Sequence, residues 1–232
     1  MLQQEVSEVG SYFSIIKAIA AGNHKLSTIA AVLEVKSTNL TKYLKTLMDL
    51  DILERRVPVT EENPEKSKRG LYKIKDNYLR FWFAFIYPNM SFIESGHSGI
   101  VMDKIRKGLT TSHIGFVYED ICEERMWELN VNNTWPFQFS KLGGYWDAKN
   151  EIDIAALDPE GKNLILGECK YWKEPVGLNV LHALETKACD VAWERDRRKV
   201  WYVLFSISGF SDELRNHAAT RDDLLLIDDR GR

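Results

Sequence analysis

The sequence has little of what marks a secreted, disordered or membrane-spanning protein. Its 232 residues include three widely scattered cysteines, too few for a disulfide framework. Only 6 prolines and 14 glycines occur, which excludes collagen-like and low-complexity chains. No apolar run approaches the roughly 20 residues that cross a bilayer, and the N-terminus has neither the basic nor the apolar region of a secretory signal. These absences predict a cytoplasmic protein without a membrane partner.

Two common site motifs are also missing. There is no CxxC, HxxxH or HExxH, which argues against a zinc site. There is no GxxxxGK[ST], so no ATP site is expected in this chain. The net charge of −3 divides into +2 over residues 1–94 (13 basic, 11 acidic) and −5 over the remainder (18 basic, 23 acidic). Neither part is basic enough to bind nucleic acid by bulk charge, so such binding must come from local patches.

The N-terminal quarter carries three short stretches of helical periodicity, within residues 7–57. Ser27 and Ser37 are predicted to cap the second and third helices. Residues 52–57 and 71–74 resemble two strands joined by a polar hairpin loop. Three short helices and a two-stranded hairpin predict a winged helix-turn-helix.

The third predicted helix and the hairpin loop carry the candidate DNA contacts. In the usual docking, this helix enters the major groove with its N-terminal residues at the bases. Asparagine pairs with adenine edges there, and lysines meet phosphates. The candidates are Thr38, Asn39, Thr41, Lys42 and Lys45 in the helix, with Lys68 and Arg69 in the loop. The alternative is a helical module whose charges are only solvated, and acidic residues beside the loop favour it.

Aromatic residues crowd positions 76–93 too densely for one helix face. We interpret this segment as a helix buried on several sides between two domains, with a base-stacking platform as the alternative. Glycines and small polar residues follow. The expected organisation is a first domain over 1–94, a linker over 95–112 and a second domain over 113–232.

The second domain holds the strongest chemical pattern. Residues 151–157 alternate so that Ile152 and Ile154 share one strand face and Asp153 lies on the other. A hairpin turn leads into an apolar run typical of a buried strand, and Glu168 and Lys170 interrupt that run on one side. The hairpin is therefore expected to bring the aspartate alongside the other two residues.

Two carboxylates and an ammonium buried together are costly unless they pair or hold a metal. Mg²⁺ or Mn²⁺ suits Asp153 and Glu168 with a main-chain carbonyl, here that of Cys169, and waters. Lys170 would then orient a water for attack on phosphorus. The alternative is a surface salt bridge at the strand ends.

These residues carry a resemblance. Glu151-Ile152-Asp153 followed by Gly167-Glu168-Cys169-Lys170 resembles the core of the PD-(D/E)xK nuclease superfamily, which has the restriction-endonuclease-like fold. The resemblance implies catalytic Asp153, Glu168 and Lys170, with a further carboxylate from the first helix, for which Glu119 is the match. Helices over 113–129 and 178–192 and a strand over 199–205 complete an expected αβββαβ core, so the fold class is α/β.

Most of the chain also resembles the C-terminal half of a prokaryotic family of predicted AAA-type ATPases, which ends in a nuclease-like domain of unknown function. The similar stretches are residues 77–83, 116–119, 151–155 and 206–210. This resemblance implies an association with a P-loop ATPase, in cis or in trans.

Three hypotheses remain open from the sequence. The first is a divalent-metal-dependent DNA endonuclease, a hydrolase targeted by its winged helix. The second is a non-catalytic DNA-binding or regulatory protein. The third is an interaction half that requires the ATPase. A homodimer is also considered, because nucleases that cut both strands often work as pairs.

Overall fold

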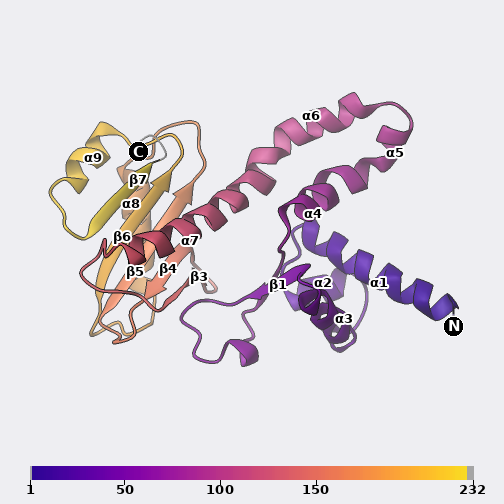
Figure 1. The fold of residues 1–232 in the computed structure, drawn as a ribbon, viewed down its shortest axis with the longest axis horizontal. Helices are drawn as coiled ribbons and strands as arrows, with labels where there is room; N and C mark the ends of the chain where they lie inside the picture. Colours follow the sequence, from indigo (N-terminus) through magenta and orange to yellow (C-terminus); the bar gives the residue numbers. More distant parts are fainter. Residues whose placement is uncertain (1, 229–232) are drawn as a thin grey trace. The chain divides into compact units, whose positions relative to one another are not determined.

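A computed structural model describes residues 2–228, which form two compact units (Figure 1). The first unit comprises residues up to Val57 together with Asn63–Leu109. The second comprises Pro58–Glu62 and the residues from Thr110 onward. Residues 58–62 lie in the predicted hairpin loop, yet the Val59 amide donates to the Gly144 carbonyl at 3.0 Å within the second unit.

The first unit begins with the helices α1 (Leu2–Ala20), α2 (Leu26–Val32) and α3 (Ser37–Asp49). Strands β1 (Leu53–Arg56) and β2 (Leu71–Ile74) follow and pair antiparallel, with the short helix η1 (Pro64–Lys66) between them. Apolar residues from all three helices and both strands form one core, which buries Ile15, Ile29, Leu44, Leu53 and Ile74. The three helices and two strands thus occur where the periodicity predicts them.

The predicted helix caps are wrong. The cap positions of α2 and α3 are Lys25 and Lys36, and neither makes a side-chain capping bond. Lys25 is extended because it forms a β-bridge with Leu71, so the chain enters α2 directly from this pairing. A long-range contact of this kind cannot be predicted from the local sequence around Ser27.

Residues 77–109 complete the first unit as a series of short helical segments. They are α4 (Asn77–Phe81), η2 (Trp82–Ile86), η3 (Tyr87–Asn89), α5 (Met90–Glu94) and α6 (Ser98–Leu109). The aromatic segment is helical, as predicted, but its burial is selective: Phe83 packs into the main core and Phe85 packs with Val101 and Ile105, while Tyr78 is 69% exposed. The stretch predicted as a linker therefore contains a helix with a buried face.

The second unit is a five-stranded mixed sheet with helices. After η4 (Thr110–Ile114) come α7 (Gly115–Val131), β3 (Lys141–Trp146), β4 (Glu151–Leu157), β5 (Asn163–Lys170), α8 (Leu178–Asp190), β6 (Lys199–Ser206), α9 (Asp212–Ala218) and β7 (Leu224–Asp228). The strand order is β3-β4-β5-β6-β7. The first three strands are antiparallel, and β5, β6 and β7 are parallel. The element order α7-β3-β4-β5-α8-β6 matches the αβββαβ prediction, and the fold is mixed α/β.

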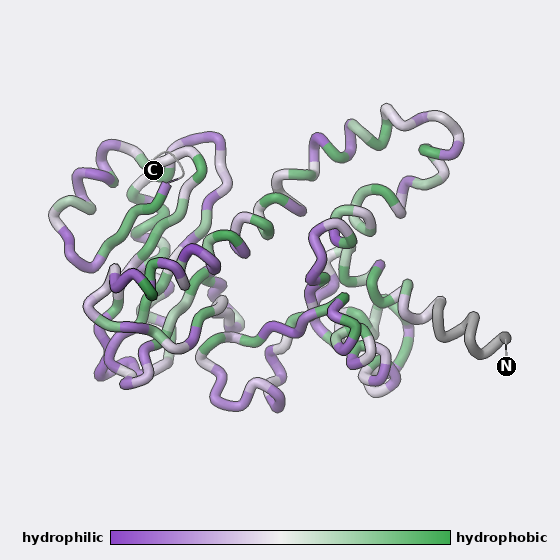
Figure 2. Tube along the Cα trace, in the orientation of Figure 1, coloured by the Kyte–Doolittle hydropathy of each residue, from purple (hydrophilic) through white to green (hydrophobic). Residues whose placement is uncertain are grey.

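Helices cover both faces of this sheet. Leu181 and Leu184 of α8 pack with Leu164 and Leu204 of the sheet, whereas α7 packs on the residues of the opposite face. Figure 2 shows the strands as the most continuously apolar part of this unit. Within residues 2–228, no helix has the length and apolar character to cross a membrane.

The inward face of α7 differs from the one that its sequence predicts. The apolar residues that recur at helical spacing in this segment are Ile114, Val117, Tyr118, Ile121 and Cys122. The buried residues are instead Tyr118, Cys122, Met126 and Asn130, spaced four apart, and Ile121 is 52% exposed. The Asn130 side chain exchanges two 3.0 Å hydrogen bonds with the backbone of Phe139, so a polar residue anchors the segment that leads into β3.

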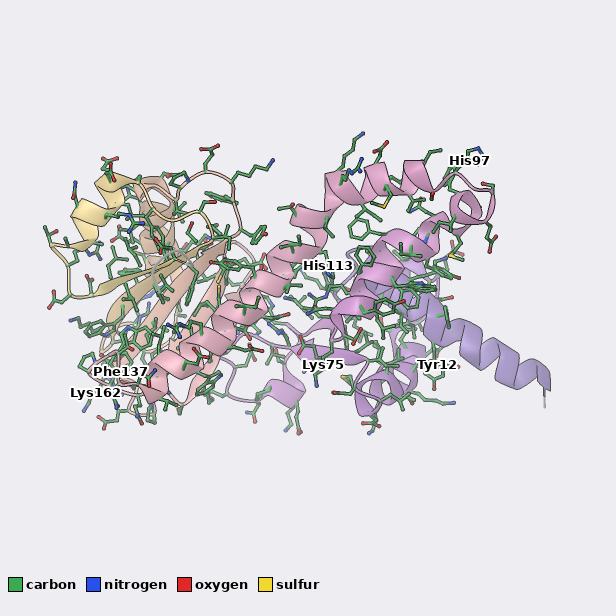
Figure 3. All side chains as sticks on the ribbon, turned by 45° about the horizontal axis from the view of Figure 1, so that its top comes forward. Tyr12, Lys75, His97, His113, Phe137 and Lys162 are labelled. Atoms are coloured by element: carbon green, nitrogen blue, oxygen red, sulfur yellow. The ribbon has the colours of Figure 1, made fainter. Side chains whose placement is uncertain are left out.

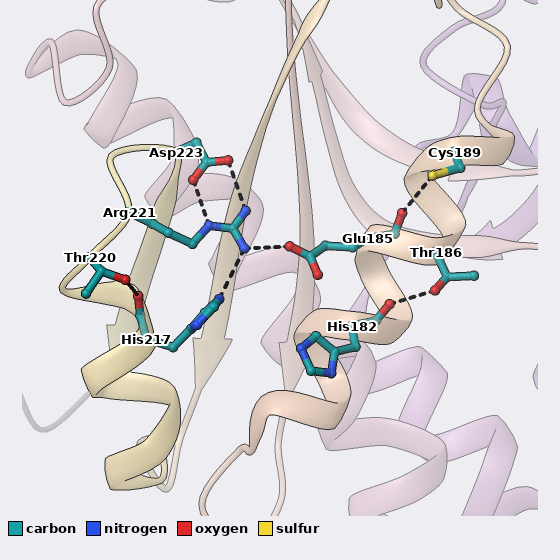
Figure 4. Close-up of polar contacts among 8 residues, drawn as sticks. All are labelled: His182, Glu185, Thr186, Cys189, His217, Thr220, Arg221 and Asp223. Atoms are coloured by element: carbon teal, nitrogen blue, oxygen red, sulfur yellow. Dashed lines mark hydrogen bonds and ion pairs between the residues drawn. The ribbon is translucent and has the colours of Figure 1, made fainter.

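Aromatic pairs and one arginine add specific contacts to these cores. In the first unit the Tyr12 ring meets Tyr43 edge-on at 5.1 Å, and in the second Phe137 lies 5.6 Å from Trp201 between ring centroids (Figure 3). Arg221 donates to both oxygens of Asp223, at 2.8 and 2.9 Å, and to Glu185 of α8 at 2.5 Å (Figure 4). This bidentate pair lowers the pKa of the Asp223 carboxyl and ties the sheet edge to α8.

Candidate functional site

The site forms where β4 begins and β5 ends, because the two strands are neighbours and antiparallel. A β-bulge lies at this point of β4. Gly143 of β3 pairs with Ala155, but Tyr145 pairs with Ile152, so three steps along β4 oppose two along β3. The extra residue breaks the alternation, and Ile152 and Ile154 pack into different cores. The prediction that they share a face is therefore wrong. Bulges are common beside active sites, where they redirect side chains.

Asp153, Glu168 and Lys170 meet in a cluster of ion pairs. The Lys170 ammonium lies 3.3 Å from Asp153 Oδ2 and also donates to Glu168 Oε2. The backbone N–H of Cys169 donates to the same Asp153 oxygen at 2.8 Å. The side chains of these three charged residues are 17%, 6% and 18% exposed, in that order. They are therefore not a solvated surface bridge, the alternative considered from the sequence.

The environment affects the two carboxylates differently. Burial, and next the charge of Glu168, raise the pKa of Asp153, although Lys170 opposes them. Burial also acts to raise the pKa of Glu168, but contacts with two lysines outweigh it and lower that pKa. Burial works against the charge of Lys170 too, yet the paired carboxylates raise its pKa. Lys170 is therefore a cation at neutral pH.

A second lysine belongs to this cluster and was missed from the sequence. Lys187 of α8 donates to Glu168 Oε1 at 2.6 Å and to the Glu151 carbonyl at 2.7 Å. Both oxygens of Glu168 are thus occupied by ammonium groups. Lys187 lies seventeen positions beyond Lys170 in the chain, on a separate helix, so the Glu-x-Lys spacing contains no signal for it.

The remaining predicted residues of this site lie on the α7 side of the sheet. Cys169 packs with Tyr118 and Cys122, so its thiol points away from Glu168. Burial, and next the contact with Cys122, raise the pKa of this thiol well above its usual range. Glu119 lies in α7, and its charge contributes to this shift. Within the described residues, the hydrogen bonds of Asp153, Glu168 and Lys170 involve one another, the Cys169 amide and Lys187, and not Glu119.

The predicted DNA-contacting residues are exposed in the first unit. Thr38, Asn39, Thr41, Lys42 and Lys45 lie on the solvent side of α3, and Lys68 and Arg69 lie in the loop before β2. Lys45 pairs with Asp49 at 3.0 Å, with both side chains more than half exposed, so this contact adds little stability. The amide of Arg69 donates to the Ser67 hydroxyl at 3.1 Å, which shapes the loop.

One stretch of this chain matches the model of a known family. Residues 82–188 match DUF234, described as archaea bacterial proteins of unknown function. The match runs from η2 through most of α8, and so includes every residue of the ion-pair cluster.

A related archaeal protein extends the similarity. The uncharacterized protein MJECL04 of Methanocaldococcus jannaschii is 40% identical over 174 residues, which is 75% of this chain and 38% of the relative. The chain therefore spans well under half the length of that relative.

Two solved structures share only a distant likeness with this chain. A repair endonuclease from Pyrococcus abyssi has a TM-score of 0.29 and 10% identity, covering 46% of this chain and 45% of its own. The O-methyltransferase NcsB1 from neocarzinostatin biosynthesis has a TM-score of 0.24 and 12% identity, covering 98% and 64%. Neither score establishes a shared fold, so the fold description rests on the strand order and pairing above.

Proposed function

We propose that the second unit is a divalent-cation-dependent phosphodiesterase of the PD-(D/E)xK type that cleaves DNA, and that the first unit is a winged helix that binds the DNA. One observation carries the catalytic part of this proposal. Two carboxylates and a lysine that the sequence pattern predicts as a site come together in a mostly buried cluster at adjacent strand ends, beside a β-bulge.

The donor set fits a hard divalent cation. Asp153 Oδ2 and both Glu168 oxygens receive N–H groups, while Asp153 Oδ1 receives none from the described residues. Asp153, Glu168 and the Cys169 carbonyl would hold Mg²⁺ or Mn²⁺, with waters completing the coordination. Within the described residues, no group of three or more His, Cys, Asp and Glu forms a ready-made metal site. Because both Glu168 oxygens already accept from ammonium groups, a cation bound to Glu168 would replace one of these contacts.

Bound there, Mg²⁺ would supply positive charge to offset the charge that develops on the phosphate during cleavage. The chain's own residues supply the rest. Lys170 is protonated and donates hydrogen bonds, so its role is to orient the attacking water or a phosphate oxygen. Lys187 holds Glu168 from the α8 side and keeps its carboxylate in place for the cation.

A second candidate function has its own supporting observation. The cluster contains two carboxylates, Asp153 and Glu168, and two ammonium groups, Lys170 and Lys187, so its charges balance without a cation. This arrangement also suits a nuclease-derived domain that has kept its fold but serves as a DNA-binding or regulatory module.

The partner proposal rests on the longer relative. The chain spans 38% of that protein, which leaves room for a further domain, and the similar stretches over residues 77–83 and 206–210 resemble ATPase-associated proteins. We therefore propose that this chain works with a P-loop ATPase. A co-purification in which no ATPase associates with the tagged full chain in its native host would contradict this part.

Plasmid nicking separates the two candidate functions. We expect the wild-type chain to nick supercoiled plasmid with Mg²⁺ or Mn²⁺ but not with EDTA. Lys170→Ala should lose activity by about 100-fold or more. Lys173→Ala, an exposed lysine three positions away, should cleave normally. Duplex binding by the wild type without nicking in either metal would favour the regulatory function.

A further inference from the structure

A cavity of about 340 Å³ lies within the first unit, beside the predicted DNA-contacting elements. The start of α3, the segment before α2 and the loop between β1 and β2 form its walls. The side chains of its polar lining are those of Lys25, Ser27, Ser37, Arg55, Ser67, Lys68 and Tyr72. The lining contains three cations, four hydroxyl groups and no carboxylate. The whole chain has a net charge of −3, so the positive charge of the cavity does not reflect the overall composition.

The first unit holds these groups in place through contacts far apart in the sequence. Lys25 is fixed beside β2 by its bridge to Leu71 and by the 2.8 Å hydrogen bond from the Tyr72 amide to the His24 carbonyl. Ser37 is the first residue of α3. These cavity walls are therefore built on secondary structure rather than on loops alone.

Arg55 organises the third wall. Its guanidinium donates to the Pro64 carbonyl at 2.8 Å and to the Ser67 carbonyl at 2.6 Å, and so closes the loop. The guanidinium lies against Gly70, where an added Cβ would be 2.5 Å from Arg55 Nε. A larger residue at position 70 would therefore displace the guanidinium from this position.

No carboxylate of the described residues forms an ion pair with the cationic groups of the cavity. Arg55 bonds to neutral carbonyls, and neither Lys25 nor Lys68 forms an ion pair with any residue that the structure describes. Arginine, lysine and hydroxyl groups are the side chains that bind phosphate oxygens. The ligand chemistry that suits this cavity is therefore a phosphate group.

We infer that this cavity binds a backbone phosphate of DNA and fixes the position of α3 on the duplex. The inference rests on the proposed DNA binding and adds Lys25, Ser27 and Arg55 to the contacts expected from the sequence. A backbone phosphate is favoured over a small phosphate compound because the cavity includes the start of α3 and Lys68, both part of the predicted DNA interface.

Fluorescence anisotropy with a labelled duplex tests whether the phosphate that the cavity binds belongs to DNA. We expect Lys25→Ala and Lys68→Ala in the full chain each to weaken binding by roughly 5–10-fold and to reduce the slope of log K against log salt by about 1. Lys25→Arg should retain binding. Lys66→Ala is the matched control, because this exposed lysine lies in the same loop but not in the cavity lining, and should change the affinity by less than about twofold.

Titration with inorganic phosphate, followed by the amide NMR signals of Ser37 and Ser67, tests the cavity without DNA. Shifts that Lys25→Ala abolishes support the phosphate site, even where the wild type binds no duplex and the proposed function fails. If the signals shift but Lys25→Ala and Lys68→Ala bind the duplex as the wild type does, the cavity binds a small phosphate compound. That outcome overturns the inference that the cavity binds a phosphate of DNA. Absence of shifts together with unaltered duplex binding overturns the inference.

Discussion

At the scale of single residues, the central feature is that the pKa values of two neighbouring carboxylates shift in opposite directions. Burial and the like charge of Glu168 disfavour the ionised form of Asp153 and raise its pKa. Two lysines outweigh burial at Glu168 and lower its pKa. A raised carboxyl pKa in the folded state costs stability wherever the group is ionised, and a lowered one adds stability there.

We therefore expect Asp153→Asn and Glu168→Gln to have opposite effects at pH 7. Asp153→Asn removes an unfavourable buried charge and should raise the melting temperature. Glu168→Gln leaves two lysines without their shared carboxylate and should lower it. A change of 1 kcal/mol moves the melting temperature of a chain this size by roughly 2–4 °C, which scanning calorimetry resolves.

The pH dependence of these variants follows from the same pKa directions. Stability from Glu168 is present above the ordinary glutamate pKa and is lost as the pH falls through its lower folded value. The penalty at Asp153 disappears as that group protonates. Both differences from the wild type should shrink toward about pH 3.5. Melting temperatures that shift in the same direction at pH 7 would contradict the assigned pKa directions.

Lys187 gives a residue-scale prediction for activity. Its contact helps to keep Glu168 ionised, so Lys187→Ala should move the acid limb of the pH–rate profile for DNA cleavage to higher pH and reduce the rate at pH 7 by about tenfold. Lys173→Ala serves as the control. A uniformly lower rate with an unmoved acid limb would mean that Lys187 has a structural role only.

The sequence predicted the three residues of the cluster because their spacing on a β-hairpin is local information. Lys187 could not be found in this way, since its contact depends on where α8 crosses the sheet. The β-bulge at Asp153 could not be predicted from the sequence either, because it is defined by the pairing of β4 with β3.

At the scale of elements, β5 reaches the site through an unusually close contact with β6. A Cβ added at Gly167 would lie 2.5 Å from Val203 Cγ1 and 2.8 Å from the Val203 carbonyl oxygen. One of these atoms belongs to the backbone and the other to a stiff, β-branched side chain, so neither can move aside without a substantial cost in free energy. Glycine immediately before Glu168 is thus a packing requirement of the sheet that presents the site.

Gly167→Ala should therefore destabilise the protein by about 1–3 kcal/mol, as measured by urea unfolding. Gly143→Ala in β3 is the matched control, because its added Cβ would meet Val59 at an ordinary 3.7 Å. The account of close packing fails if both variants unfold at the same urea concentration.

Element boundaries show where local patterns are sufficient and where they are not. Ser211 caps α9, since its hydroxyl accepts from the Leu214 amide at 3.2 Å within one turn. Ser27 and Ser37 do not act as caps. At α2 the reason is the strand pairing of Lys25 with Leu71, a contact between distant parts of the chain.

At the scale of the whole molecule, the chain consists of two units with separate cores. Periodicity predicts the three helices and the hairpin of the first unit, and the αβββαβ order of the second unit was expected together with the nuclease resemblance. Periodicity gave no indication that residues 58–62 group with the second unit, because the amide of Val59 pairs with a strand more than eighty residues away. The proposed division of labour assigns DNA binding to the first unit and cleavage to the second.

The most direct test of this account is the rate of plasmid cleavage by Asp153→Asn in Mg²⁺, compared with the wild type under the same conditions. The account predicts cleavage by the wild type and a loss of at least about 100-fold in the variant, together with a melting temperature no lower than that of the wild type. Cleavage by the variant at the wild-type rate would show that the cluster of Asp153, Glu168 and Lys170 is not the catalytic site.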